Sequence, residues 1–390
     1  MKKLLYLALW NIEDKVSNDG VAKKVIEQAQ TFLDIGYEAD VVMRNETRML
    51  VFSIPDNNVK EFQMKSSHVL PQRKYFYKSV FDYLPVDQYD VIYIRYQLAD
   101  IYFCRLLEHL YRTKKDSTPI LVEIPSYPYV GECRHDFKKR VLYIQDVIHR
   151  KKLKLWVDRI VTLEKSDQIF GIPTLYIQNG VFLQGYRLKK QNQSKSLNFC
   201  CAAQFAAWHG IDRLLRGIAQ YKKHSYPECP VHLYLAGEGP ELNNLQKITN
   251  QLGLQSEVTF CGKLNQKQLY EQLYDRCDIG VECLALFRRS ENAISSSLKS
   301  REYLAVGMPF IYSGKIDVLE QNAADFVFEI PSSEEPVDIQ SVIDEYNKLL
   351  QKETKKELSA RIRTYANQCV SWQTTMSEVV KWIQQDKKGE

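Results

Sequence analysis

One stretch of the chain, residues 290–312, decides the fold and points to a site: Ser290-Glu-Asn-Ala-Ile-Ser-Ser-Ser-Leu-Lys-Ser-Arg-Glu-Tyr-Leu-Ala-Val-Gly-Met-Pro-Phe-Ile-Tyr312. Its serine run, 295–297, suits the N-terminus of a helix, where the first backbone N–H groups have no partner within the helix. Gly307-x-Pro309 is typical of the end of that helix. The Phe-Ile-Tyr that follows predicts a buried strand. The stretch therefore predicts a short helix that leads directly into a strand.

The same helix start predicts a site for an anion. Free N–H groups and the positive end of the helix dipole attract negative charge, and Lys299 adds a cation in the next turn. Glu302 lies seven residues after Ser295 and returns to the same helix face about 10 Å along the axis. A phosphate at the helix start and a ribose diol at Glu302 would fit that separation. The alternative is a capped surface helix with a Lys299–Glu302 ion pair.

Strand and helix patterns alternate along the rest of the chain. In the first half, apolar runs predict strands at 4–10, 39–43, 91–96, 120–124, 159–163 and 175–178. In the second half, similar runs predict strands at 197–202, 231–235, 258–260, 279–281, 309–312 and 326–329. Helical patterns lie near 21–33, 101–113, 136–152, 210–222, 240–252, 265–276 and 296–306, and they dominate 337–387. This alternation predicts an α/β fold with a doubly wound parallel sheet in each half.

Composition narrows the class of protein. The 390 residues are enough for two ordinary domains, joined at the polar and basic stretch 185–197. The net charge of +5 is spread out, so we expect no nucleic-acid partner. Nine scattered cysteines without a CxxC pair favour a reducing cytosol over a disulfide framework or a zinc site. The apolar run 4–10 suits a first strand better than a signal peptide, and no run reaches the roughly 18 residues of a membrane span.

Several motifs follow one another in a characteristic order. The second half contains Gln204-Phe-Ala-Ala-Trp-His209-Gly210, Leu235-Ala-Gly237-Glu-Gly239, Val258-Thr-Phe-Cys-Gly-Lys263-Leu264, Cys277-Asp-Ile-Gly-Val281 and then the stretch 290–312. Elsewhere the chain contains Asp19-Gly20-Val21, Asn179-Gly-Val181 and Ser371-Trp372. This ordered set resembles the retaining GT-B glycosyltransferases of family 4, whose Glu-x7-Glu motif corresponds to the stretch 290–312. The resemblance covers nearly the whole chain.

The resemblance implies two Rossmann-like domains that face a central cleft. They would be an acceptor-side domain at 1–187, a nucleotide-sugar domain at 188–368, and a C-terminal helix at 369–390 that crosses back to the first domain. The implied reaction moves a sugar from a nucleotide-diphosphate donor to an acceptor hydroxyl with retention of configuration. Implied acceptors are a glycan, a lipid-linked sugar or a glycoprotein of cell-surface polysaccharide or glycoconjugate biosynthesis. The implied location is cytoplasmic, with peripheral contact at the inner face of the plasma membrane.

The resemblance also implies site residues. The donor would be bound by Gly20, Gln204, His209, Gly237, Gly239, Lys263, Leu264, Ser296, Ser297, Leu298, Lys299 and Glu302. Catalytic roles are implied for Glu123, Lys299 and Glu302. A carboxylate such as Glu302 can accept hydrogen bonds from both ribose hydroxyls, while the helix start and Lys299 can hold the diphosphate. The chain has no Asp-x-Asp pair that could bind a metal ion, so we expect no metal. We also expect no cofactor, since the nucleotide sugar is a co-substrate.

The sequence departs from the family's pattern at three places. Ile294 stands where the first glutamate of the motif is expected, which leaves Glu291 or Asn292 to replace it. Gln204 and His209 stand where the family has Arg and Lys, so compensation of the diphosphate charge would depend on Lys299, Arg301 and His209. The strand-end histidine of the first domain has no match, and Glu123 and Tyr127 are the polar residues of that region.

These departures keep two other functions open. One is a non-catalytic GT-B subunit that binds an acceptor or a partner protein. The other is a sugar-nucleotide 2-epimerase of the same fold, although its carboxylate and histidine set is not recognisable here. Two basic stretches, 134–140 and 149–156, would suit an anionic membrane surface, and the alternative is a solvated helix face.

Overall fold

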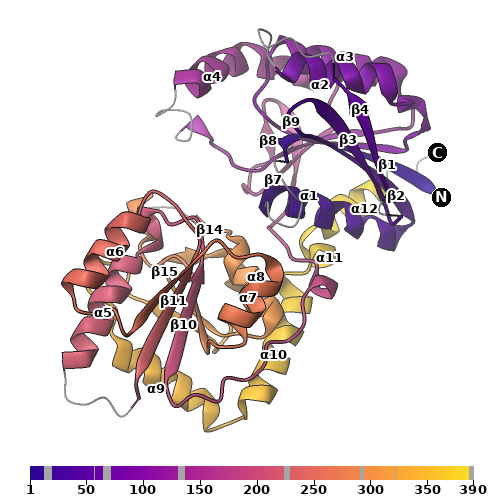
Figure 1. Cartoon of the computed structure of the whole chain (residues 1–390). Coiled ribbons are helices and arrows are strands. Elements are labelled where there is room, and N and C mark those ends of the chain that lie inside the picture. Colours follow the sequence, from indigo (N-terminus) through magenta and orange to yellow (C-terminus); the bar gives the residue numbers. More distant parts are fainter. Residues whose placement is uncertain are drawn as a thin grey trace. The chain divides into compact units, whose positions relative to one another are not determined.

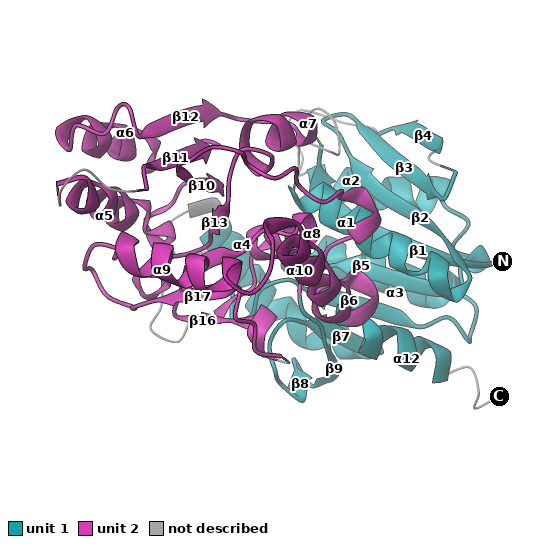
Figure 2. Ribbon diagram, turned by 90° about the horizontal axis from the view of Figure 1, so that it is seen from below, with its two compact units in different colours: residues 1–178, 375–390 teal, residues 179–374 magenta. Residues whose placement is uncertain are grey.

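The computed structural model describes residues 1–12, 20–56, 58–64, 72–130, 137–223, 229–289, 294–320 and 322–385. The chain forms two compact units, coloured separately in Figure 2. Unit 1 comprises Met1–Gln178 together with Thr375–Glu390, and unit 2 comprises Asn179–Thr374. Within the described part of the chain, no helix is both long and apolar enough to cross a membrane.

Unit 1 contains a nine-stranded sheet with the strand order β4-β3-β2-β1-β5-β6-β7-β9-β8. Its strands are β1 (Lys2–Asn11), β2 (Tyr37–Arg44), β3 (Arg48–Ile54), β4 (Asn58–Gln63), β5 (Val91–Arg95), β6 (Ile120–Ile124), β7 (Arg159–Thr162), β8 (Gln168–Ile169) and β9 (Ile172–Tyr176). The central strands β2, β1, β5, β6, β7 and β9 pair in parallel. The pairs β2–β3, β3–β4 and β8–β9 are antiparallel.

Helices cover both faces of this sheet. They are α1 (Gly20–Thr31), α2 (Gln72–Tyr83), α3 (Ile101–Thr113), α4 (Phe137–His149) and α12 (Ser377–Gln385). Figure 1 shows α2, α3 and α4 on one face and α1 with α12 on the other. Every residue of β5 and β6 is buried, as expected of parallel strands covered on both sides.

The last helix belongs to unit 1, although the long segment 179–374 that separates it from the rest of that unit forms unit 2. The backbone N–H of Tyr176 in β9 donates a hydrogen bond to Glu378 of α12 (3.1 Å). The guanidinium of Arg159 in β7 lies 4.9 Å from the ring centre of Trp382. These contacts attach the C-terminal helix to the strands at one side of the sheet.

Unit 2 contains a six-stranded parallel sheet with the order β12-β11-β10-β13-β15-β17. Its strands are β10 (Leu197–Ala202), β11 (Val231–Ala236), β12 (Val258–Gly262), β13 (Ile279–Val281), β15 (Phe310–Ser313) and β17 (Val327–Ile330); β14 (Ile294–Ser295) and β16 (Lys315–Ile316) form a separate pair. Its helices are α5 (Ile211–Lys223), α6 (Leu242–Gln251), α7 (Gln266–Leu269), α8 (Leu298–Val306), α9 (Ile339–Leu350) and α10 (Lys355–Cys369), and α11 (Trp372–Thr375) follows at its end. The predicted doubly wound sheets are therefore confirmed in both halves.

Unit 2 begins and ends at adjacent segments. Val181 forms a parallel bridge with Ser371. The N–H of Val181 donates to the carbonyl of Val370 (2.9 Å), and the N–H of Trp372 donates to the carbonyl of Val181 (3.3 Å). The chain thus enters and leaves this unit at one place.

Candidate functional site

The strand order of unit 2 reverses between β10 and β13, which are neighbours in the sheet but far apart in the sequence. In open α/β sheets, ligands bind outside the carboxyl ends of the strands at such a reversal. The segments that follow the two strands meet there. The N–H of Leu284 donates to the carbonyl of His209 (3.0 Å), and that of Ala285 donates to the carbonyl of Trp208 (3.2 Å). Any site at this edge is built from these segments and from the start of α8.

Helix α8 begins as the serine run predicts. Ser297 is the N-cap, with an extended backbone (φ −81°, ψ 152°), but its side chain makes no capping hydrogen bond. Instead, the hydroxyls of Ser297 (2.6 Å) and Ser295 (3.0 Å) both donate to the carboxylate of Glu282. The hydroxyl of Ser296 is buried and has no partner within the described part of the chain. The N-cap side chain therefore leaves the first N–H groups of α8 to other acceptors.

A buried charge pair lies under this helix start. Glu282 follows β13 directly and is fully buried. Burial alone would raise the pKa of Glu282, but Lys299 and the two serine hydroxyls outweigh it, so the pKa is lowered. Burial would lower the pKa of Lys299, yet the facing Glu282 carboxylate outweighs it, so that pKa is raised. Both groups are therefore charged at neutral pH.

Lys299 is the polar group of this cluster that most needs a ligand. Its Nζ is shielded from solvent and makes no hydrogen bond to any described residue. An ammonium group carries three donors, and leaving them unpaired in a buried place is costly. Oxygen atoms of an anion at the start of α8 would satisfy them. This arrangement carries the assignment of the site.

His209 adds a neutral donor. Its Nδ1 accepts a hydrogen bond from the N–H of Ala206 (3.1 Å), so the proton of the neutral ring lies on Nε2. Burial, and then the charge of Lys299, lower the pKa of His209 to about 3. The sequence suggests His209 as a possible cation that compensates phosphate charge. The structure instead makes it a neutral hydrogen-bond donor.

Arg301, the other expected cation, is committed elsewhere. Its guanidinium is buried and forms an ion pair with Asp317 (2.6 Å). It also donates to the carbonyls of Asn179 (2.9 Å) and Ser297 (3.2 Å). Arg301 therefore holds the segment before α8 in place rather than facing a ligand.

Glu302 lies one turn further along α8 and is half-buried. One carboxylate oxygen accepts a hydrogen bond from the hydroxyl of Tyr186 (2.7 Å), and the other accepts one from Tyr274 (3.2 Å). These contacts fix the orientation of the carboxylate.

Two glycines shape the loop that faces β10. Gly237 and Gly239 have φ values of +123° and +141°. A Cβ at Gly237 would lie 2.0 Å from the carbonyl oxygen of Ala203, and one at Gly239 would lie 2.4 Å from the nitrogen of Phe205. The backbones after β10 and β11 can approach this closely only because both residues are glycine. Three further predicted donor residues lie at the same edge of the sheet. Gln204, which is exposed, follows β10, while the exposed Lys263 and the half-buried Leu264 follow β12.

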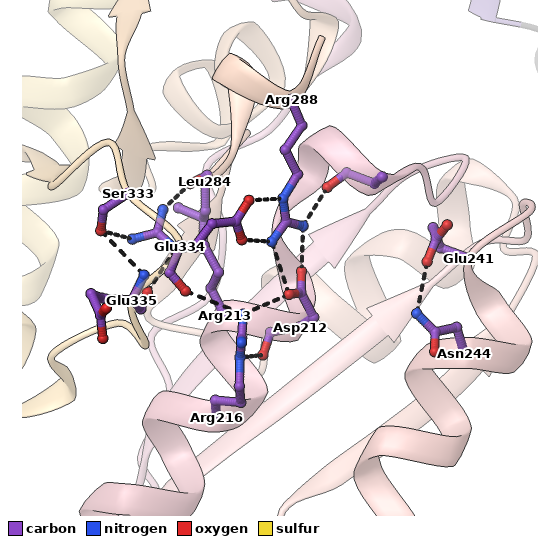
Figure 3. Close-up of polar contacts among 11 residues, drawn as sticks. Asp212, Arg213, Arg216, Glu241, Asn244, Leu284, Arg288, Ser333, Glu334 and Glu335 are labelled. Atoms are coloured by element: carbon purple, nitrogen blue, oxygen red, sulfur yellow. Dashed lines mark hydrogen bonds and ion pairs between the residues drawn. The ribbon is translucent and has the colours of Figure 1, made fainter.

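An ion-pair network fixes the segments that carry His209 (Figure 3). Arg288 pairs with both oxygens of Asp212 (2.8 and 3.0 Å) and with Glu334, and it donates to the carbonyl of Ala207 (2.9 Å). The neighbouring Arg213 donates to the carbonyl of Leu284. The network therefore joins the segment after β10 to the segment after β13.

Two predicted site residues, Gly20 and Glu123, belong to unit 1, and the others belong to unit 2. Gly20 is the first residue of α1. Glu123 in β6 is fully buried and accepts hydrogen bonds from Lys24 (3.0 Å), Gln28 (2.9 Å), Tyr93 (2.7 Å) and Arg95 (3.2 Å).

Burial would raise the pKa of Glu123, but Lys24 and Arg95 outweigh it and lower the pKa to about 2. Because Lys24 and Gln28 belong to α1, this carboxylate attaches the helix to the sheet.

Some sequence expectations cannot be compared with the structure. Asp19, Glu291, Asn292 and residues 134–136 of the first basic stretch lie outside the described residues. Ile294, in place of the first motif glutamate, is in β14 and is 52% exposed. Glu282 is a site residue that the sequence reasoning missed. The available signal was an acidic residue directly after a buried strand, at the edge where parallel sheets bind ligands.

Comparison with known proteins identifies the class. Residues 186–368, nearly all of unit 2, match the family model of the glycosyl transferases group 1. Unit 2 is thus similar to the group 1 glycosyl transferases. A comparison with curated protein sequences gives no match.

Solved structures show the same fold over the full length. A glycosyltransferase from Rickettsia africae has a TM-score of 0.62 and 14% identity, covering 100% of this chain and 99% of that chain. Sucrose-phosphate synthase from Thermosynechococcus elongatus has a TM-score of 0.59 and 13% identity, covering 100% of both chains. Anabaena Alr3699/HepE, solved in complex with UDP-glucose, has a TM-score of 0.52 and 15% identity, covering 100% of this chain and 99% of that chain. The chain therefore has the GT-B fold of glycosyltransferases.

Proposed function

We propose that the protein transfers a sugar from a nucleotide-diphosphate donor to an acceptor hydroxyl with retention of configuration and without a metal. The observation that carries this proposal is the buried ammonium of Lys299, which has no hydrogen-bond partner among the described residues and lies at the start of α8. The family match of unit 2 supports sugar transfer in general. The structure in complex with UDP-glucose supports a uridine nucleotide as the first donor to test.

In the proposed complex, the diphosphate accepts hydrogen bonds from the first N–H groups of α8, from Lys299 and from Nε2 of His209. The ribose hydroxyls donate to Glu302, which Tyr186 and Tyr274 already orient. Negative charge grows on the diphosphate as the sugar leaves. Contacts with fixed donors and with Lys299 therefore strengthen in the transition state, which is what accelerates the reaction.

The proposed acceptor is a glycan, a lipid-linked sugar or a glycoprotein of cell-surface polysaccharide or glycoconjugate biosynthesis. The proposed location is the cytoplasm, with unit 1 in contact with the inner face of the plasma membrane. Glu123 is proposed to act by holding α1, rather than by touching the donor, because its oxygens already accept hydrogen bonds from both α1 and the sheet.

The experiment measures binding and turnover of a panel of nucleotide sugars that includes UDP-glucose, UDP-N-acetylglucosamine and GDP-mannose. Replacing Lys299 removes a charged hydrogen bond worth about 1.5–3 kcal/mol, so donor binding should weaken roughly 10- to 100-fold. We use the double variant Glu282→Gln/Lys299→Met, because it leaves no unpaired charge in the site. Lys247→Met on the exposed side of α6 is the matched control and should bind like the wild type.

A non-catalytic GT-B subunit is the second candidate, favoured by the exposed Ile294 at the position of a sugar-binding carboxylate. It predicts that a glycan or protein binds while every donor remains unchanged. Slow donor hydrolysis or transfer by the wild type, lost in Glu302→Ala with the melting temperature retained, would exclude it. If no donor binds at all, the proposed function is wrong.

A further inference from the structure

Helix α4 and the 3-10 segment after it, Arg150–Leu155, expose apolar side chains in unit 1. The exposed fractions are 60% for Ile144 and 62% for Ile148. Val141, Val147 and Leu155 are exposed as well. Exposed apolar residues are common singly, but a cluster of this kind marks a surface that contacts something. We call these five residues the α4 apolar surface.

The spacing of these residues places them on one side of the helix. At about 100° per residue, positions 141, 144, 147 and 148 lie within an arc of about 120°. Asp146 lies on the opposite side and is fully buried. The helix therefore buries a carboxylate and turns an apolar stripe outward, the opposite of an ordinary surface helix.

The inward face explains why α4 keeps this orientation. Asp146 accepts hydrogen bonds from the hydroxyls of Tyr96 and Tyr129 (2.6 Å for Tyr129) and from the N–H of Ala99 (2.8 Å). Arg150 forms an ion pair with it (3.4 Å) and lies 5.0 Å from the ring centre of Phe170. Rotating the helix to bury the stripe would break these contacts and leave a buried carboxylate unpaired, which is costly.

Cations accompany the α4 apolar surface. Lys139 and Arg140 are exposed in the first turn of α4, and Lys151, Lys152 and Lys154 are exposed after it. Asp146 is the sole acidic residue in the sequence 137–155, and it is paired inside the unit. The solvent-facing side of this segment is therefore apolar and positively charged without a carboxylate of its own.

We propose that the α4 apolar surface docks unit 1 on an anionic lipid bilayer. Its aliphatic side chains enter the boundary between headgroups and acyl chains, and the flanking cations contact the phosphates. A second copy of this chain is a poorer occupant, because self-pairing of the same surface would bring lysines against lysines. This inference extends the proposed peripheral location. It rests on the proposed function only in explaining why the protein would bind a membrane, since a lipid-linked acceptor would lie at such a surface.

The test measures sedimentation of the full chain with vesicles. One set contains phosphatidylglycerol and phosphatidylcholine, and the other contains phosphatidylcholine alone. We expect binding to the anionic vesicles that falls with salt, and at least tenfold weaker partitioning of the variant Ile144→Asp/Ile148→Asp. The matched control, Val59→Asp/Tyr111→Asp, changes two exposed apolar residues of unit 1 outside this surface and should bind like the wild type.

A second variant, Lys151→Gln/Lys152→Gln/Lys154→Gln, tests the charge separately from the apolar stripe. About 1 kcal/mol for each basic residue near an anionic surface corresponds to roughly fivefold weaker partitioning per lysine removed. Equal binding to both vesicle types, binding that neither variant reduces, or no binding at low salt would overturn the proposal. So would a dimer in light scattering that Ile144→Asp/Ile148→Asp converts to a monomer. Donor binding by the same samples shows independently whether the site in unit 2 works.

Discussion

Replacing Glu282 with glutamine tests the buried charge pair at the start of α8. The substitution keeps the size of the side chain and an oxygen that can accept from Ser295 or Ser297. It removes the negative charge that faces Lys299, whose ammonium group is shielded from solvent. The variant therefore leaves an uncompensated cation in a buried place.

The expected loss in the free energy of unfolding is about 3–5 kcal/mol, the usual cost of removing one partner of a buried pair. The control Glu345→Gln removes one partner of an exposed pair with Lys348 and should cost less than about 1 kcal/mol. The double variant Glu282→Gln/Lys299→Met removes both charges, so it should be more stable than the single variant Glu282→Gln.

The pH dependence of stability follows from the directions of the two pKa shifts. The lowered pKa of Glu282 adds stability above the ordinary carboxyl pKa, and this is lost as the pH falls through the folded value. The raised pKa of Lys299 adds stability below the ordinary lysine pKa, and this is lost as the pH rises through the folded value. The pair is thus fully stabilising between roughly pH 5 and 10.

Denaturant unfolding of the wild type, Glu282→Gln, Lys299→Met and the double variant provides a double-mutant cycle, with Glu345→Gln as the control. A coupling of about 2 kcal/mol or more between positions 282 and 299 is the expected result. Saturating donor should restore part of the stability of Glu282→Gln, because its diphosphate supplies the missing negative charge. Stability of Glu282→Gln within about 1 kcal/mol of the wild type, or strictly additive effects, would refute the argument.

Three further predictions concern other residues of the two units. Glu123→Gln should lower the unfolding free energy by about 3–5 kcal/mol at pH 7. In the wild type, the stability that Glu123 contributes should decline below about pH 4, as the pH approaches the carboxyl's pKa of about 2, and urea unfolding at several pH values measures both effects. Gly237→Ala should cost at least about 3 kcal/mol or prevent folding, because its Cβ would lie 2.0 Å from a carbonyl oxygen and its φ of +123° is strained for alanine. Thermal unfolding beside Gly253→Ala (φ +65°), where the Cβ would meet no atom within 4 Å, gives the smaller cost of a left-handed residue without a clash, and an equal loss in both variants would contradict the argument. His209→Ala should weaken donor binding by an amount that does not change between pH 6 and 8, because the ring is already neutral; calorimetric titration at both pH values checks this, and a wild-type loss of affinity on raising the pH would contradict it.

Much of the fold follows from local patterns in the sequence. The strands β10 and β11 match mostly apolar runs, because strands covered on both faces bury most of their side chains. The edge strand β4 was not predicted. Its residues are mostly exposed, and it forms by pairing with β3, which no hydropathy pattern records. The predicted helix at 265–276 is shorter, since α7 ends at Leu269 and a π-helical turn follows over Tyr270–Tyr274.

Part of the site could also be predicted, because some of its features depend on residues close together in the sequence. The start of α8 follows from its serines, which act locally. The place of His209 beside the segment after β13 depends on β13 lying next to β10, a neighbour relation created by the strand order. The facing of Lys299 and Glu282 likewise depends on how α8 packs at the end of β13, which no local pattern records. The direction of Lys299 was equally hidden, because α8 is buried on several sides, and such a helix gives no polar face from which to infer orientation.

The bridge between Val181 and Ser371 has a consequence for folding during synthesis. Unit 2 is one continuous segment, so it can close its own chain ends and complete its sheet once residue 374 has left the ribosome. Unit 1 begins to appear first but lacks α12 until the final residues are made. During synthesis, β7 and β9 therefore remain without the contacts to α12 until all of unit 2 has been made.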